Sequence, residues 1–329
     1  MQAVVVDEFG PPNVLTHHEV ADPEPGPRDV LVRIGAVGVN RADLLARAGQ
    51  YYLAGPPPLV LGLEAAGEVV KVGSEVTGLG PGVRVVTRGA TNAPGFYAEL
   101  AAVPATSCVV IPEDVTFEAA CCLPTAWLSA WYCLHTLAGI RPTDRVLVHA
   151  AASGVGSAAI QIARDAGARV VATASTRVKV AWAIEQGASV GIATSDLDGS
   201  SLANAVRDRL GGEGPDVVLD SVGGPTFAES LRAVGYGGRV VALGNVAVAP
   251  TTLDTRDFYP KNLTIHGFQI TTLMGHGYDP GPDLNLLLEA LRQRRFVVPI
   301  AARFELRHAA EAHRMLEDRT TMGKVVLVP

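Results

Sequence analysis

The sequence predicts an α/β protein with two domains, one β-rich and one a doubly wound parallel sheet covered by helices on both faces. Three observations support this fold class. The chain has 329 residues, more than one domain usually contains. Its first hundred residues hold short apolar runs separated by proline and glycine clusters. From Asp144 onward, apolar runs alternate with helical patterns, as is typical of a parallel sheet.

A single helix, Arg41–Ala48, is predicted within the β-rich domain, with Asn40 as its N-cap because its side chain can accept an orphan backbone N–H. The proline-rich segment Gly49–Pro58 should be a surface loop that carries Tyr51 and Tyr52. The predicted strands are Ala3–Val6, Leu15–Val20, Val30–Val39, Ala65–Val72, Val83–Thr87 and Phe96–Val103.

After Ile111 the pattern becomes helical and then alternates between strand and helix. The predicted helices are Thr116–Leu123, Ala126–Leu137, Ser157–Ala166, Leu202–Leu210 and Pro225–Val234. The predicted strands are Val146–Val148, Val170–Ala172, Ser189–Ala193, Asp216–Asp220, Arg239–Gly244 and Leu263–Phe268. The closing segments, which could return to the first domain, are Asp283–Arg295, Val297–Phe304, Ala309–Glu317 and Lys324–Val328.

Composition excludes several classes of function. Hydrophobic residues make up 48% of the chain and charged residues 18%, which indicates a core-forming protein. The formal net charge of −6 argues against a general nucleic-acid or anionic-membrane binder. No apolar run approaches the roughly 20 residues of a membrane span, and Met1 leads directly into a strand-like segment. We therefore expect a soluble, cytoplasmic protein.

The cysteines and histidines form no recognisable ligand set. Adjacent Cys121 and Cys122 suit neither a shared metal ion nor a disulfide, and we expect the cysteines to be buried apolar thiols. The 8 histidines are scattered, so we expect surface or packing roles for them.

The stretch Asp144–Thr176 has the order of a dinucleotide-binding unit: strand, glycine-bearing turn, helix and second strand. The three fingerprint glycine positions fall on Ala151, Ser153 and Gly156, so only the last is a true fingerprint glycine. Alanine at the first position still permits close approach, and the backbone from Gly154 through Val155 to Gly156 can come near a phosphate. An ordinary strand-to-helix turn is the alternative.

The corner after the second strand indicates which nicotinamide cofactor binds. An NAD-type site places an acidic residue there to bond the ribose 2′-hydroxyl. Residues 173–179 contain no acid, and their hydroxyls and two cations suit a 2′-phosphate. A solvated helix start is the alternative. NADPH is therefore the expected cofactor, and the residues expected at its 2′-phosphate are Ser175, Thr176, Arg177 and Lys179.

Five stretches carry a family resemblance: Asn40–Tyr51, Leu61–Gly67, Ala126–His135, Ser153–Gln161 and Gly323–Leu327. With them the chain resembles the zinc-independent quinone oxidoreductases of the medium-chain dehydrogenase/reductase superfamily, and most of all the p53-inducible quinone oxidoreductase-like branch. The resemblance implies a GroES-like catalytic domain made of residues 1–122 and 296–329. It also implies a Rossmann domain made of residues 123–295, with the cofactor in the cleft.

Two departures from the zinc-dependent members of this superfamily argue against a metal. Where those enzymes carry a zinc-ligand cysteine this chain has Asn40, and Leu63 replaces the histidine of their G-H-E motif. Arg88–Gly95, where a structural zinc loop would fall, contains no cysteine. Without a Lewis acid the oxidation of an alcohol is hard to support, whereas quinones and α,β-unsaturated carbonyls accept hydride easily.

The resemblance also implies site residues. Asn40 would lie near the nicotinamide and bond substrate or cofactor. Tyr51 would face the substrate, where its phenol either donates to a quinone oxygen or only lines the pocket. Both are candidate catalytic residues. Gly244 and Asn245 end a parallel strand, where ligands bind in open sheets. The remaining residues expected at the cofactor are Ser129, Ser153, Lys179, Phe268 and Lys324.

The favoured function is therefore NADPH-dependent, metal-free reduction of quinones or similar conjugated electrophiles. Two alternatives stay open. An enoyl-thioester or alkenal reductase is one, because the apolar, proline-lined segment Tyr51–Leu61 suits an acyl group as readily as a ring. An NADPH-binding protein whose redox state governs a partner interaction is the other. By resemblance we also expect a homodimer that pairs through the strand Leu263–Phe268.

Overall fold

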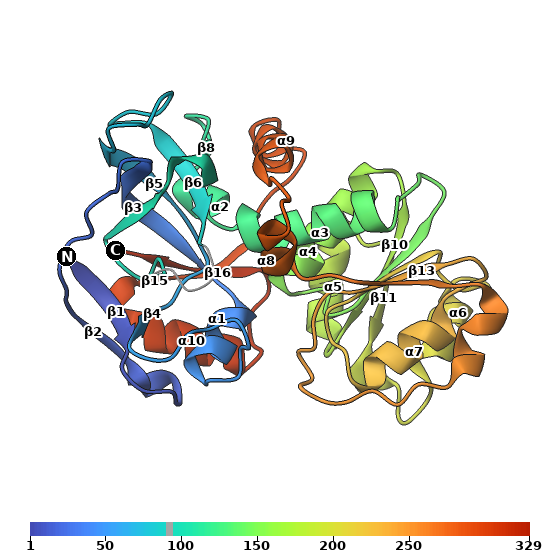
Figure 1. Ribbon diagram of the computed structural model, residues 1–329. Helices are drawn as coiled ribbons and strands as arrows, with labels where there is room; N and C mark the ends of the chain where they lie inside the picture. The colour runs from blue at the N-terminus through green and yellow to red at the C-terminus, as the bar shows by residue number, and fades with distance from the viewer. Residues whose placement is uncertain (90–94) are drawn as a thin grey trace. The chain divides into compact units, whose positions relative to one another are not determined.

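The computed structural model describes residues 1–89 and 95–329 (Figure 1). Their contacts divide the chain into two compact units. Unit 1 contains Met1–Leu128 and Gly277–Pro329, and unit 2 contains Ser129–His276. Residues 123–128 and 277–295 thus lie in unit 1, whereas they were predicted to lie in the dinucleotide domain. The ring of Trp127 packs at 5.2 Å from that of Phe296, which ties residues 123–128 to the segment that follows residues 277–295.

Unit 1 is mainly antiparallel β structure. Its strands are β1 (Gln2–Val6), β2 (Leu15–Glu19), β3 (Asp29–Val39), β4 (Leu59–Val60), β5 (Glu64–Val72), β6 (Arg84–Arg88), β7 (Leu100–Pro104), β8 (Cys108–Val110), β15 (Ile300–Glu305) and β16 (Lys324–Val328). Its α-helices include α1 (Arg41–Arg47), α2 (Phe117–Ala120), α9 (Gly281–Arg292) and α10 (Ala309–Glu317).

The long strand β3 organises unit 1. It pairs antiparallel with β5, β7 and β16, in a sheet whose order is β15-β16-β3-β5-β6-β8. The red C-terminal strand β16 therefore lies beside the blue strand β3 in Figure 1, and both ends of the chain build one unit. A smaller sheet has the order β2-β1-β4.

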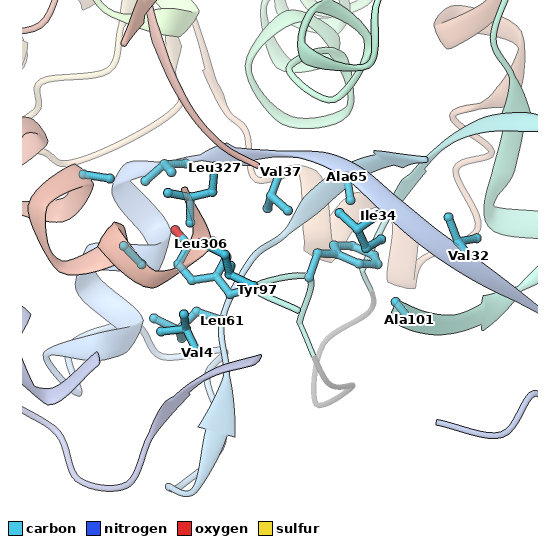
Figure 2. Close-up of a cluster of buried hydrophobic side chains, with 14 of the residues drawn as sticks. Val4, Val32, Ile34, Val37, Leu61, Ala65, Tyr97, Ala101, Leu306 and Leu327 are labelled. Atoms are coloured by element: carbon cyan, nitrogen blue, oxygen red, sulfur yellow. The ribbon is translucent and has the colours of Figure 1, made fainter. Parts of the chain in front are cut away.

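Apolar side chains from distant segments form the core of unit 1 (Figure 2). Along the first half of β3 buried and less buried residues alternate, with Val30, Val32 and Ile34 inside. The last four residues of β3 are all buried, so this strand carries Asn40 into the interior. Each fully buried aliphatic side chain contributes about 1.5–3 kcal/mol relative to exposure.

Unit 2 is a parallel sheet. Its strands are β9 (Arg145–Val148), β10 (Arg169–Ala174), β11 (Val190–Ala193), β12 (Val217–Asp220), β13 (Arg239–Ala242) and β14 (Thr264–Gly267). Its α-helices include α4 (Gly154–Asp165), α5 (Arg177–Glu185), α6 (Leu202–Arg209), α7 (Pro225–Ala233) and α8 (Ile270–Gly275). The strand order β11-β10-β9-β12-β13-β14 is the 3-2-1-4-5-6 order of the Rossmann fold, so the predicted doubly wound sheet is confirmed.

Most predicted elements occur within one or two residues of their predicted ends, but several differ. The strand predicted at 96–103 begins only at Leu100. Before it, Tyr97 O accepts the N–H of Val4 at 2.7 Å, which draws this segment toward β1. Residues 123–137, predicted as parts of two helices, form one α-helical turn, α3 (Leu128–Trp131), between two π-helical turns. The elements β4, β8 and α8 were not predicted, and α5 begins at the corner where a helix start was given only as the alternative.

Among residues 1–89 and 95–329, no helix combines the length and the apolar character that crossing a membrane requires. The predicted cytoplasmic location stays a prediction.

A buried polar network joins α1 to α10. Arg47 Nη1 lies 3.2 Å from His313 Nδ1, and Tyr97 Oη lies 2.9 Å from His313 Nε2. Because arginine is only a donor, Nδ1 must be the acceptor, and the Nε2–H donates to Tyr97. His313 is therefore neutral, and burial together with the neighbouring Arg47 lowers its pKa to about 3.

We expect His313 to make the protein more stable as the pH rises toward neutrality. Between the folded pKa of about 3 and the ordinary value of 6.5, the unfolded chain binds more protons, so the free energy of unfolding increases with pH. Burial raises the pKa of Asp43 from 3.8 to about 7. Between these values the folded protein binds more protons at Asp43, so this group makes the free energy of unfolding decrease as the pH rises. Replacing His313 alone therefore isolates its contribution.

In His313→Gln, the gain in unfolding free energy between about pH 4 and 6.5 should be smaller than in the wild type, because a shift of one pKa unit corresponds to about 1.4 kcal/mol. Urea unfolding at several pH values measures this difference. Parallel stability curves for the two proteins would contradict the neutral assignment of His313.

Candidate active site

The turn between β9 and α4 is the predicted dinucleotide turn. Ala150 adopts a left-handed conformation with φ 48°, and α4 then begins at Gly154 with Ser153 as its N-cap. The Ser153 Oγ accepts the N–H of Gly156 at 3.0 Å. The helix thus starts three residues before the predicted Ser157, because Ser153 caps it. The first N–H groups of α4 lie at the positive end of the helix dipole, where phosphate oxygens bind.

Gly156 has the role of the third fingerprint glycine. A Cβ at this position would lie 2.4 Å from Ala150 O and 2.7 Å from Ala151 Cα. Real Cβ atoms do not approach backbone so closely, so only glycine lets α4 pack against the end of β9. This close packing fits the turn to a dinucleotide.

A buried chain of hydrogen bonds lies at the ends of β9, β10 and β12. Ser230 Oγ donates to Asp220 Oδ2 at 2.8 Å, so its oxygen accepts the Nε2–H of His149 at 3.0 Å. His149 Nδ1 then accepts the hydroxyl proton of Thr173 at 2.8 Å. Burial lowers the pKa of His149, although the Asp220 carboxylate opposes this effect. The neutral imidazole therefore joins the three strand ends.

The other oxygen of Asp220 holds a second loop. Asp220 Oδ1 accepts the N–H groups of Val222 and Gly223 at 2.8 and 2.9 Å. A Cβ on Gly223 would lie 2.7 Å from Asn245 Oδ1, so the loops after β12 and β13 are adjacent. Asn245 itself donates from Nδ2 to Ala249 O at 3.2 Å. Asn245 therefore lies beside the loop at the carboxyl end of β12. Sequence reasoning did not identify His149 or Asp220 as residues of this edge of the sheet.

The predicted 2′-phosphate corner follows β10. Ser175, Thr176 and Arg177 are exposed, and Thr176 caps α5 by accepting the N–H of Lys179 at 3.3 Å. Arg177 Nε lies 2.8 Å from Asp196 Oδ2. Asp196 lies in the short 3-10 helix Thr194–Asp196 that follows the neighbouring strand β11, so the local sequence of the corner did not reveal this acid. The Arg177 ion pair lowers the pKa of Asp196.

Two further predicted cofactor residues lie elsewhere in unit 2. Ser129 is buried on α3. Phe268 follows β14 directly and stacks on Tyr132 with 5.6 Å between the ring centroids.

In unit 1 the structure brings Asn40 and Lys324 together with Glu64, which sequence reasoning missed. Lys324 is 3% exposed and donates to Val39 O at 3.0 Å, Asn40 Oδ1 at 2.7 Å and Glu64 Oε1 at 2.8 Å. Burial lowers the pKa of Lys324, but the Glu64 carboxylate outweighs that effect and the pKa is raised. The sequence signals for Glu64 are an acid beside an apolar strand pattern and its place as the glutamate of the stretch that corresponds to the G-H-E motif.

Asp43 and Tyr51 belong to the same unit as Asn40. Asp43 accepts the N–H groups of Asn40 at 2.8 Å and Gly62 at 3.2 Å, which joins the start of α1 to the segment before β5. Tyr51 is half-buried and packs against the unit 1 core, with its ring 5.7 Å from that of exposed Tyr52. Both tyrosines lie in the predicted loop after α1.

The residues near Asn40 do not fit a catalytic zinc ion. The ammonium of Lys324 already takes the oxygen atoms that Asn40 and Glu64 present, and a second cation there would be repelled. Across the described ranges 1–89 and 95–329, three or more His, Cys, Asp or Glu residues never gather as a metal site would need. Residues 90–94, which belong to the segment where a structural zinc loop would fall, lie outside those ranges. Cys121, Cys122 and Cys133 are buried thiols, as predicted, whereas Cys108 is half-buried.

Comparison with known proteins identifies the family. Residues 26–113 match the alcohol dehydrogenase GroES-like domain, and residues 154–279 match the zinc-binding dehydrogenase model. A quinone oxidoreductase from Pseudomonas aeruginosa is 34% identical over 325 residues, which cover 98% of this chain and 97% of that protein. The chain belongs to the quinone oxidoreductase-like family of the medium-chain dehydrogenase/reductase superfamily. The predicted family and fold class are confirmed, and the finer branch stays a prediction.

Two further proteins of this family are informative. A 2-haloacrylate reductase from a Burkholderia species is 33% identical over 335 residues, covering 100% of this chain and 99% of that protein. The structure of Escherichia coli quinone oxidoreductase complexed with NADPH matches with a TM-score of 0.90 and 31% identity, covering 100% of both chains. This chain is therefore a medium-chain oxidoreductase.

Proposed function

We propose that this protein uses NADPH to reduce quinones or closely related conjugated carbonyl compounds. The strongest support from the structure is the pairing of two features in unit 2. One is the capped, closely packed turn at Gly156, which suits a pyrophosphate, and the other is the corner after β10 that carries Ser175, Thr176, Arg177 and Lys179. The NADPH complex of the Escherichia coli quinone oxidoreductase supports the choice of cofactor.

The residues of this chain have distinct tasks in the proposed reaction. The backbone N–H groups at the start of α4 hold the pyrophosphate, and the hydroxyls and cations of the corner hold the 2′-phosphate. Ser129, Gly244, Asn245 and Phe268 complete the cofactor site. Asn40 contacts the nicotinamide end of the cofactor, and Tyr51 borders the substrate. NADPH would supply the hydride when it is bound, and the proton that completes the quinol would come from water or from the Tyr51 phenol, while the other residues orient the reactants.

Reduction of an activated alkene is the second candidate. The 2-haloacrylate reductase is 33% identical to this chain, against 34% for the quinone oxidoreductase from Pseudomonas aeruginosa, so identity does not separate the two activities. Quinones, haloacrylates and enoyl thioesters all accept hydride at a conjugated system.

A panel of acceptors tests the proposal. Purified protein should oxidise NADPH with a naphthoquinone, more efficiently than NADH, and a chelator should not change the rate. Turnover with enones or acyl-CoA substrates but not with quinones would favour the alkene reductase. Tight NADPH binding without turnover of any acceptor would overturn both assignments and indicate a binding protein.

A homodimer stays a proposal that rests on the family resemblance. The edge strand β14 supports it, because Thr264, Ile265 and Gly267 are exposed at the end of the sheet in unit 2. An open edge strand presents unpaired N–H and C=O groups to a second strand.

A further inference from the structure

The contacts of Asn40 define which kind of hydrogen bond it can make with a ligand. Its Nδ2 group donates to Gly38 O at 3.1 Å and to Glu64 Oε1 at 2.9 Å, which uses both of its N–H bonds. Its Oδ1 accepts from Lys324 Nζ at 2.7 Å. Within residues 1–89 and 95–329, these bonds leave Asn40 no further donor, so any additional hydrogen bond of its side chain must be accepted by Oδ1.

The orientation of the Asn40 amide is unambiguous. A lysine ammonium can only donate and an ionised carboxylate can only accept, so Oδ1 must face Lys324 and Nδ2 must face Glu64. Rotating the amide by 180° would set the ammonium against an N–H group and the carboxylate against an oxygen. Lys324 and Glu64 together therefore determine the direction of this side chain.

Glu64 and Lys324 are themselves held in place by several hydrogen bonds. Lys324 has three N–H bonds and three oxygen acceptors, so its ammonium is saturated inside unit 1. Glu64 is 0% exposed, and its second oxygen accepts the N–H of Thr125 at 2.7 Å. A Cβ on Gly38 would lie 2.2 Å from Glu64 Oε1, so glycine at this position of β3 makes room for the carboxylate. Lys324 therefore has no donor left for a ligand, and Glu64, which offers no donor, is held through both of its carboxylate oxygens.

We propose that Glu64 and Lys324 are positioning residues that hold Asn40 as a hydrogen-bond acceptor for NADPH. The inference rests on the proposed function. A quinone or enone oxygen can only accept, so it finds no donor on Asn40, whereas the carboxamide and hydroxyl groups of NADPH are donors. Asn40 thus binds the cofactor and does not stabilise the negative charge that forms on the substrate. Lys324, expected from the resemblance to bind the cofactor, acts through Asn40.

The first test separates cofactor binding from turnover. In Asn40→Ala, the Kd and KM for NADPH should rise by up to about tenfold, as expected for one hydrogen bond, while kcat at saturating NADPH and the KM for the quinone change little. This variant keeps the Glu64–Lys324 ion pair, so it should fold. A large fall in kcat with an unchanged KM for NADPH would overturn the proposal, because it would make Asn40 a donor to the substrate.

The second test asks whether Glu64 and Lys324 act through Asn40. Glu64→Gln/Lys324→Met removes both buried charges together and should raise the Kd for NADPH to a similar extent. Adding Asn40→Ala to this pair should then have little further effect, since the residues work as a unit. Additive effects would overturn the proposal.

A matched control is Arg47→Met, which removes another 3% exposed cation of unit 1. It should lower the melting temperature and leave the Kd for NADPH unchanged. If Arg47→Met raised this Kd as much as the Asn40, Glu64 and Lys324 variants do, general destabilisation would explain all of these rises. That result would overturn the proposal. Because the Kd is measured by calorimetry without turnover, an enzyme that binds NADPH but reduces no acceptor would contradict the proposed function alone.

Discussion

The Arg177→Ala/Lys179→Ala variant should lose most of its preference for NADPH over NADH. Both cations, exposed Arg177 and half-buried Lys179, lie at the corner after β10, where the 2′-phosphate is proposed to bind. A hydrogen bond to a charged group contributes about 1.5–3 kcal/mol, so each lost cation should lower kcat/KM for NADPH by roughly 10- to 150-fold. NADH lacks the phosphate, and its kcat/KM should change little. Steady-state kinetics with both cofactors measures the effect, and equal losses would show that the phosphate site is misplaced.

Asp196→Asn is the matched variant with the opposite charge change at the same corner. Asp196 pairs with Arg177 at 2.8 Å, on a surface where an ion pair contributes little to stability. Removing the carboxylate releases Arg177 and removes a negative charge that repels the phosphate, so the KM for NADPH should fall while that for NADH stays the same. An increase in the KM for NADPH would mean that Asp196 positions Arg177 productively.

Gly156→Ala should abolish most NADPH binding. The added Cβ would lie 2.4 Å from Ala150 O, so α4 would have to move away from the end of β9. Overpacking of this kind costs about 1–3 kcal/mol, and it would displace the N–H groups proposed to hold the pyrophosphate. The Kd for NADPH and that for NADH should both rise by more than about tenfold, since the two cofactors share the pyrophosphate. Calorimetry measures both.

Gly275→Ala provides the control for this substitution. Gly275 ends α8 in the same unit, and a Cβ there meets no atom within 4 Å among the described residues. Its affinity for NADPH should equal that of the wild type. An unchanged affinity for NADPH in Gly156→Ala would contradict the proposal that this turn binds the dinucleotide.

The sheet of unit 2 could be predicted from the sequence because its signals are local. Each apolar run is short, each is followed by a helical pattern, and parallel strands joined in this way follow a few topologies. The composite unit 1 was predicted through family resemblance rather than periodicity. Its closure depends on β16 pairing with β3, and no local pattern states that Val326 lies opposite Gly38.

The site was harder to predict, because its buried polar residues bind through partners far away in the chain. Glu64 and Lys324 are separated by 260 residues, and His149 and Ser230 by 81. A single charged residue in an apolar strand pattern does not indicate its partner, because the partner is brought near only by the fold. Asp196 is exposed, and it was missed because it reaches Arg177 from the 3-10 helix after the adjacent strand β11.

The proposed hydride transfer is tested most directly by an anaerobic single-turnover reaction, in which the protein is mixed with a naphthoquinone and NADPH deuterated at C4. We predict that one quinol forms for each NADPH consumed, and that deuterium slows the reaction because the bond to C4 breaks in that step. Bound NADPH that yields no quinol, and no reduced product when an enone replaces the quinone, would contradict the account.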